Sequence, residues 1–180
     1  MTTHIVLLRG INVGGHNRLP MPALREVLEG LGYARVRTLL QSGNALVDSD
    51  ESAATLARRV HDAIELDLKL DLPIITRTAA QLAQVVAADP LGSVATVGKF
   101  YNCWFLSGKP GADVLDDIDL QAFAPSTCTI VGHELYTWTP AGMHADRLVR
   151  TLSERRLGVT ATARNWNTVV KLHELARDNS

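Results

Sequence analysis

The spacing of hydrophobic residues predicts alternating strands and helices in the first half of the chain. A short apolar run at 4–8 is typical of a buried strand, and a loop rich in glycine and asparagine follows it. Apolar residues at helical spacing predict a helix from Pro22 to about Gly32 and a second helix over 52–68. The other elements expected in this half are strands at 34–40, 45–47 and 73–76 and a helix around 82–87.

The second half of the chain predicts the same order of elements. Strands are expected at 100–106, 127–131, 135–138 and 159–163, and helices at 113–123, 145–157 and 168–176. Each half then reads β-α-β-β-α-β plus a helix, the split βαβ pattern of ferredoxin-like units. Proline and glycine cluster within 89–98, which favours a joint there. We therefore predict an α+β protein with two ferredoxin-like units, 1–92 and 93–180, packed into one compact body.

Composition excludes several classes of protein. The 180 residues are 46% hydrophobic and 21% charged, as in ordinary globular proteins, and a net charge of −1 argues against a constitutive duplex-DNA binder. No apolar run approaches the ~18 residues of a membrane span, and the N-terminus lacks signal-peptide features. Two cysteines without CxxC spacing, and six histidines without HxH or HExxH spacing, indicate no disulfide framework and no metal site. We expect a cytoplasmic protein.

Three polar clusters lie in predicted loops, where binding residues are often found. The first runs from Arg9 to Arg18 and contains three glycines. Glycines let backbone N–H groups converge on an anion, a following helix start adds partial positive charge, and the arginines can grip a phosphate or carboxylate. The segment is neither a P-loop nor GxGxxG. Equally, Gly10, Gly14 and Gly15 could only supply positive φ in a long connection.

The second cluster is the segment 41–44, Gln-Ser-Gly-Asn. Ser-Gly is ordinary hairpin chemistry, and an asparagine after it suits a turn. The turn explains the flanking amides less well, so Gln41 and Asn44 stay candidates for hydrogen bonds to a ligand. Ser42 lacks the GxSxG surroundings of a nucleophile.

The third cluster is the segment 164–168, which leads into the last predicted helix. One interpretation is structural, because Asn165 or Asn167 can cap the helix and Trp166 can anchor it to the core. The other is an anion site, because Arg164 directly follows a predicted strand much as Arg9 does, and the chain from 145 onward is basic.

The three clusters together resemble the signatures of a known family. Segments 7–15, 41–44 and 164–168 closely resemble, in residues and spacing, the bacterial domain of unknown function 1697 family, and the resemblance covers essentially the whole chain. His16 stands where the family pattern usually carries lysine. The resemblance implies a cytoplasmic α+β protein with ferredoxin-like parts, and it implies no established activity or catalytic residues.

We predict that the clusters converge on one pocket for an anionic or nucleotide-like small molecule, because all three sit at strand ends. Arginines would supply positive charge, and the glycine backbone would supply N–H donors. Amide side chains would hydrogen-bond to polar groups of the ligand, and the tryptophan would stack on the ligand or simply line the pocket. The candidate ligand-binding residues are Arg9, Asn12, Gly14, Gly15, Asn17, Gln41, Asn44, Arg164, Trp166 and Asn167. These clusters contain no Asp, Glu or Cys, which favours a binder over a hydrolase, and His16 is the obvious proton-transfer candidate.

Two other functions stay open. Single-stranded nucleic acid could bind through Arg9, Arg18, Arg35, Arg37 and the basic C-terminal segment, with strong salt dependence. Alternatively, the chain is a protein-interaction module with purely structural loops, and Arg9→Ala would then cost stability without changing a ligand response. The sequence assigns no cofactor, catalytic residue, membrane partner or oligomeric state.

Overall fold

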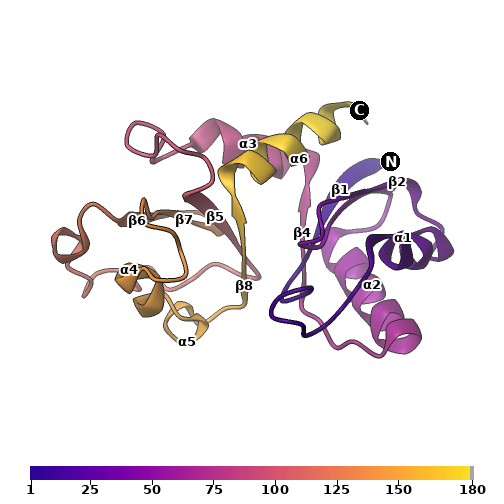
Figure 1. Ribbon diagram of the computed structural model, residues 1–180. Coiled ribbons are helices and arrows are strands. Elements are labelled where there is room, and N and C mark those ends of the chain that lie inside the picture. Colours follow the sequence, from indigo (N-terminus) through magenta and orange to yellow (C-terminus); the bar gives the residue numbers. More distant parts are fainter. Residues whose placement is uncertain (179–180) are drawn as a thin grey trace. The chain divides into compact units, whose positions relative to one another are not determined.

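The computed structural model describes residues 1–178, and the chain separates into two compact units (Figure 1). Unit 1 comprises Met1–Gln84 and the end of the chain from Lys171, and unit 2 comprises Val85–Val170. The sequence placed the joint later, between residues 92 and 93, and assigned the whole last helix to the second unit. The described residues form a mixed α/β protein with two four-stranded antiparallel sheets and six α-helices.

Unit 1 contains one sheet with two helices on one face (Figure 1). The strand order is β2-β3-β1-β4, and all neighbours are antiparallel. Its elements are β1 (Thr2–Leu8), α1 (Met21–Gly30), β2 (Ala34–Leu39), β3 (Asn44–Ser49), α2 (Ala53–Leu68) and β4 (Ile74–Thr78), and α3 (Ala79–Ala88) leads into unit 2. These elements confirm the predicted order of the first half.

The apolar stripes of both helices pack on the sheet as their periodicity predicts. Leu24 and Leu28 of α1 and Leu56, Val60 and Ile64 of α2 are buried in one core with side chains from the central strands. Local signals set the start of each helix. Pro22 lies in the first turn of α1, and the Ser52 hydroxyl caps α2 by accepting the backbone N–H of Thr55 at 3.2 Å.

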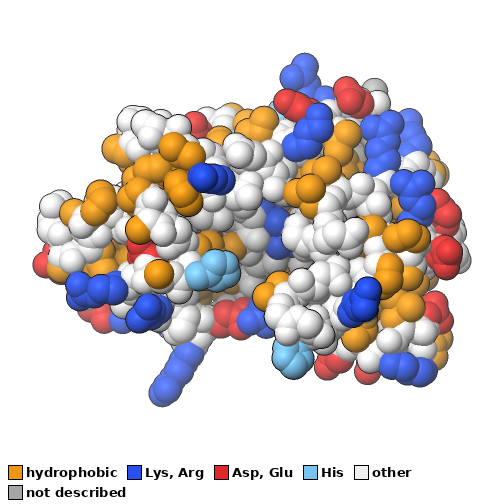
Figure 2. Space-filling model, in the orientation of Figure 1, with side chains coloured by type: hydrophobic (Ala, Val, Ile, Leu, Met, Phe, Trp, Pro, Cys, Tyr) orange, Lys and Arg blue, Asp and Glu red, His pale blue; other side chains and the backbone are white. Residues whose placement is uncertain are grey.

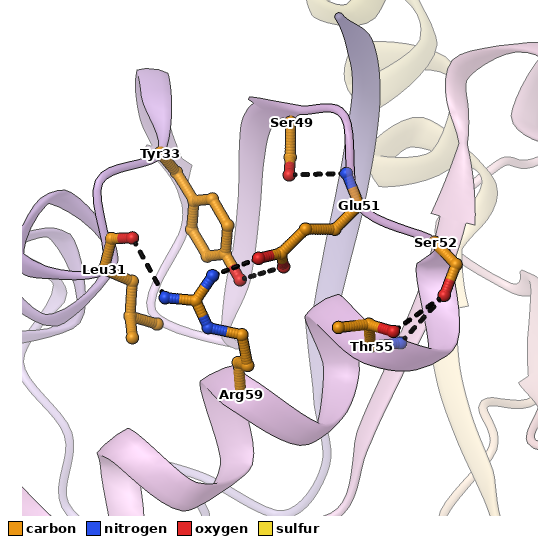
Figure 3. A network of polar contacts seen from close by, with 7 residues as sticks. All are labelled: Leu31, Tyr33, Ser49, Glu51, Ser52, Thr55 and Arg59. Atoms are coloured by element: carbon orange, nitrogen blue, oxygen red, sulfur yellow. Dashed lines mark hydrogen bonds and ion pairs between the residues drawn. The ribbon is translucent and has the colours of Figure 1, made fainter.

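A network of hydrogen bonds and an ion pair connects the end of α1, the residues before β2 and after β3, and α2 (Figure 3). The Tyr33 hydroxyl donates to Glu51 Oε2 at 3.0 Å, and Arg59 pairs with the same carboxylate. Arg59 also donates to the carbonyl oxygen of Leu31, just past α1, at 3.3 Å. Burial and then the hydrogen bond to Glu51 raise the pKa of Tyr33 to about 12.

Unit 2 repeats this strand order as β6-β7-β5-β8, again antiparallel throughout. Its elements are β5 (Tyr101–Leu106), the 3₁₀ turn η1 (Leu120–Phe123), β6 (Thr127–Val131), β7 (Glu134–Trp138), α4 (Arg147–Thr151), α5 (Glu154–Leu157), β8 (Ala161–Asn165) and α6 (Trp166–Asp178). Leucines of β5, β7, α4 and α5 form the core of this unit.

Two helices expected in unit 2 differ from the sequence prediction. Residues 113–123 form turns and one 3₁₀ turn, because four aspartates fall in the segment 113–119 and Asp119 caps the short turn instead of continuing a helix. Residues 145–157 form two short helices, because Ser153 ends the first and caps the second by accepting the backbone N–H of Arg156 at 3.3 Å.

No helix within residues 1–178 is long and apolar enough to cross a membrane. The same residues contain no group of three or more His, Cys, Asp or Glu side chains placed to hold a metal ion.

Candidate ligand-binding loops

The first polar cluster forms a small hairpin between β1 and α1. Val13 and His16 are bridged, and the backbone N–H of His16 donates to the carbonyl oxygen of Val13 at 3.1 Å. Gly14 and Gly15 between them have φ angles of 59° and 80°. A two-residue turn with positive φ at both positions is typical of a type I′ hairpin, so this turn requires both glycines. The turn is exposed at the surface.

The Asn12 side chain connects this hairpin by a hydrogen bond to the turn between β2 and β3. Its side-chain Nδ2 donates to the carbonyl oxygens of Gln41, at 2.7 Å, and Leu19, at 2.9 Å. Its Oδ1 accepts the backbone N–H of Leu19 at 2.9 Å. The Asn12 amide thus makes three hydrogen bonds within the protein. Asn17 makes a similar, single contact, donating to the carbonyl oxygen of Gly10 at 3.1 Å.

The second polar cluster is packed tightly against the first. Asn44 is fully buried and donates to the carbonyl oxygen of Leu39 at 2.8 Å. Gly43 accepts the backbone N–H of Leu8 at 2.8 Å. A Cβ on Gly43 would lie 2.6 Å from Ile11 Cδ1, so only glycine allows this approach. Gln41 and Ser42, by contrast, are exposed.

The surface of these joined loops is basic. The ionisable side chains of the loop 9–20 are Arg9, His16 and Arg18, whereas the turn 40–43 contains none, and the whole chain has a net charge of −1. Arg18 and His16 are exposed beside the glycine turn. Leu40 in the second turn is 56% exposed and has a φ of 59°, which is unusual for a leucine. The apolar pattern predicted Leu40 as the end of a strand and did not indicate this conformation.

The third polar cluster belongs to unit 2, where β8 passes into α6. The Arg164 guanidinium is buried and donates to Thr162 Oγ1 and to the carbonyl oxygen of Ala163, both at 2.8 Å. Burial lowers the pKa of Arg164 to about 10. Asn165 Oδ1 accepts the backbone N–H of Thr168 at 3.0 Å and so caps α6.

The two residues after Asn165 contact neighbouring parts of unit 2. The Trp166 ring stacks on Tyr101 with 4.6 Å between ring centroids, as an anchor to the sheet would. Asn167 lies over Gly98, where an added Cβ would come within 2.1 Å of the Asn167 amide oxygen. Gly98 is therefore a partner of the third cluster that sequence reasoning missed, since nothing in its local sequence marks the contact.

The structure thus brings the first two clusters together inside unit 1 and places the third in unit 2. Asn12, Asn17 and Asn44 are held by the fold, whereas Gly14, Gly15 and Gln41 face the surface. The hypothesis that all three clusters line one pocket stays a prediction.

This arrangement defines a two-sheet α/β protein with a basic, glycine-containing loop pair, and comparison with known proteins gives its family. Residues 1–136 match the protein family of unknown function DUF1697, so the chain belongs to that family. The match includes the first two clusters and ends before the third. No curated protein is similar enough to the chain to count as a match.

A solved structure shares the fold. The chain is similar to the conserved bacterial protein SP0830 from Streptococcus pneumoniae, with a TM-score of 0.72 and 20% sequence identity. The alignment covers 97% of this chain and 98% of that protein. At this identity the likeness shows a common fold.

Proposed function

We propose that unit 1 binds an anionic, phosphate- or carboxylate-bearing small molecule, such as a nucleotide, at the joined loops 9–20 and 40–43. One observation carries the proposal: the Asn12 side chain locks the two loops together and leaves the turn at Gly14 and Gly15 exposed among exclusively basic ionisable groups. Backbone N–H groups at a glycine turn, flanked by arginine, form a favourable environment for an anion.

The geometry divides the candidate residues by role. Asn12, Asn17 and Asn44 would position the loops, since their amides already hydrogen-bond within the protein. Gly14, Gly15, Arg18 and Gln41 would contact the ligand, because they are exposed. Arg9, Arg164, Trp166 and Asn167 stay candidates for further contacts.

We also propose that each unit is ferredoxin-like. The β-α-β-β-α-β order of unit 1 and the antiparallel strand order β2-β3-β1-β4, which unit 2 repeats as β6-β7-β5-β8, support this assignment. A cytoplasmic location is part of the proposal, and the two free, buried cysteines suit a reducing compartment.

A thermal-shift panel tests ligand binding directly. Inorganic phosphate, nucleotides, sugar phosphates, carboxylic metabolites and short oligonucleotides are added to the wild type, Arg18→Ala, Gln41→Ala and the control Arg25→Ala, an exposed arginine on α1. A ligand at about a hundred times its Kd adds ~2.7 kcal/mol to stability, or roughly 5–10 °C. We expect this shift in the wild type and the control and its loss in Arg18→Ala.

Other outcomes separate the alternatives. An oligonucleotide response that falls steeply with salt would favour single-stranded nucleic acid as the ligand, because binding then releases counterions. A wild type that responds to no compound on the panel would overturn the proposal and favour a module whose loops are purely structural.

A further inference from the structure

A second surface of unit 1 is an apolar groove between α1 and α2. The lining from α1 and its C-cap is Ala23, Glu26, Val27, Gly30 and Leu31, and the lining from α2 is Ala63, Leu66, Asp67 and Leu68. The first five positions follow the spacing i, i+3, i+4, i+7, i+8 and so form one stripe along the helix. This stripe spans nine residues, about 12 Å along the helix axis.

The floor of the groove is open. Leu66 is 69% exposed, although leucine in a helix of a globular domain is usually turned toward the core. A Cβ added to Gly30 would meet nothing within 4 Å, so the glycine leaves space that a larger side chain could occupy. Gly30 is the last residue of α1, and no close packing requires a glycine there.

Acidic side chains surround this apolar floor. Glu26 and Asp67 line the groove itself, and an adjoining depression that shares Leu66 is lined by Asp62, Glu65, Lys69 and Asp71. The Lys69 ammonium donates to the carbonyl oxygen of Leu66 at 2.7 Å, at the end of α2. Figure 2 shows hydrophobic side chains exposed over α1 and α2, with both acidic and basic side chains beside them.

Some of these carboxylates are already neutralised and others are not. Asp62 faces Arg58 at 3.6 Å, and Asp71 faces His61 at 3.0 Å. Glu26, Glu65 and Asp67 take part in no ion pair with any residue of 1–178. The groove therefore combines an open apolar floor with acidic side chains from both α1 and α2.

We propose that the α1–α2 groove docks a basic amphipathic helix of a partner protein. Such a helix presents apolar side chains at i, i+3 or i+4 and i+7, which matches a floor about two turns long. Lysine and arginine beside those positions would face Glu26, Glu65 and Asp67. The acidic rim selects a positively charged partner over an acidic one by complementarity and like-charge repulsion.

Binding is tested with synthetic peptides and the full chain. The probe is a labelled 15-residue peptide of leucine and lysine with its leucines on one helical face. One matched peptide has every lysine replaced by glutamate, and another has the same composition with leucines spread around the helix. We expect fluorescence anisotropy to show binding of the first peptide alone, and NMR shift changes over 23–31 and 63–71.

Variants locate the site without disturbing the fold. We expect Leu66→Ser, Glu65→Lys and Asp67→Lys each to weaken binding of the lysine peptide about tenfold or more. Gly30→Leu should also weaken it, with an unchanged or higher thermal midpoint, because leucine favours the helix and fills the groove. Matched controls are Ala54→Ser at the start of α2 and Asp178→Lys on α6, both exposed, which should leave binding unchanged.

Three results would overturn the proposal. The first is equal binding of the glutamate peptide or the peptide with dispersed leucines. The second is unchanged affinity in Leu66→Ser and Asp67→Lys. The third is self-association of the full chain that Leu66→Ser abolishes, because the occupant would then be a second copy of this protein.

Discussion

Asn12 is the residue on which the joined loops depend most. Its side chain makes three hydrogen bonds, and its φ of 54° lies in the left-handed region. Asn12→Gly removes the hydrogen bonds while keeping a residue that adopts this φ freely, so backbone strain does not enter. At about 1 kcal/mol for each net hydrogen bond, we expect the free energy of unfolding to fall by ~2–3 kcal/mol in urea titrations.

Asn17→Gly is the matched control for that measurement, because Asn17 also has a positive φ and its side chain makes one hydrogen bond. We expect a loss of about 1 kcal/mol there. Equal losses in the two variants would contradict the role of Asn12 as the link between the loops.

Alanine substitutions at Gly43 and Gly10 distinguish the stability cost of a steric clash from the cost of a positive φ. Both have positive φ, 80° and 69°, but a Cβ on Gly43 would clash with Ile11 and Leu8, whereas a Cβ on Gly10 would meet nothing within 4 Å. We expect Gly10→Ala to cost ~1 kcal/mol from φ alone, and Gly43→Ala to cost roughly 1–3 kcal/mol more because its neighbours must move. Chemical denaturation compares them, and similar costs would show that the contact at Gly43 relaxes easily.

The sequence predicted local features of these loops, such as positive φ and a helix cap, better than the contacts between distant residues. Positive φ at Gly14 and Gly15 was anticipated by the structural interpretation of the first cluster. The contact between Asn12 and Gln41 was not, because it joins residues 29 positions apart and depends on how two loops meet. The cap provided by Asn165 could be predicted because its partner, Thr168, lies three residues away.

Two histidines on different elements of unit 1 should give opposite pH effects. Burial lowers the pKa of His4 on β1 and outweighs the opposing effects of Asp48 and Glu51. Asp71 and then Asp62 raise the pKa of His61 on α2 by hydrogen bonding. His4 therefore costs stability as pH falls below about 6.5, whereas His61 adds stability there and loses it as pH rises through its folded pKa.

Urea unfolding at pH 5 and pH 7.5 measures both effects. His4→Phe should reduce the loss of stability at pH 5, because the unfavourable proton uptake is gone. His61→Gln should increase that loss by a smaller amount, because His61 is about one-third exposed. The assignment of these two histidines would be wrong if the variants changed the pH dependence in the same direction.

At the scale of elements, hydrophobic periodicity succeeded where one helix face is buried along its whole length. The stripe on α2 predicted a helix over 52–68, and the structure has a helix over Ala53–Leu68 with Ser52 as its N-cap. It failed at 145–157, where all three leucines are buried, but Leu148 and Leu157 belong to two different short helices and Leu152 lies between them. Because the apolar spacing continues across these 13 residues, the spacing alone does not reveal that one helix ends and a second one, capped by a serine, begins within them.

For the whole molecule, the predicted repeat is seen in the strand order of the two sheets, and matching positions of the two sheets carry arginine. Arg77 on β4 lies opposite Ile5 of β1, and Arg164 on β8 lies opposite Cys103 of β5. Each arginine is buried and donates at 2.8 Å to the carbonyl oxygen of the residue before it. The sequence analysis singled out Arg164 and not Arg77, although Arg77 also directly follows a predicted strand, at 73–76.

The tyrosines provide a test of core burial in the whole protein. All three are buried, and burial is the largest cause of a raised pKa in each, with the pKa of Tyr33 at about 12. Unfolded tyrosine ionises near pH 10, so stability should fall as pH rises above that value. We expect tyrosinate absorbance at 295 nm to stay flat from pH 9 to 11 in the folded protein and to rise near pH 10 in concentrated urea.

Glu51→Gln identifies the contribution of Tyr33 to that titration. The neutral amide removes the carboxylate charge that holds the Tyr33 proton, so the pKa of Tyr33 should move down toward 10 while Tyr101 and Tyr136 stay protonated. The tyrosinate absorbance of one tyrosine should then appear at lower pH in the variant than in the wild type, while the circular dichroism of the folded state is retained. A wild type that releases one or more phenolic protons near pH 10 while still folded would contradict the burial of these side chains.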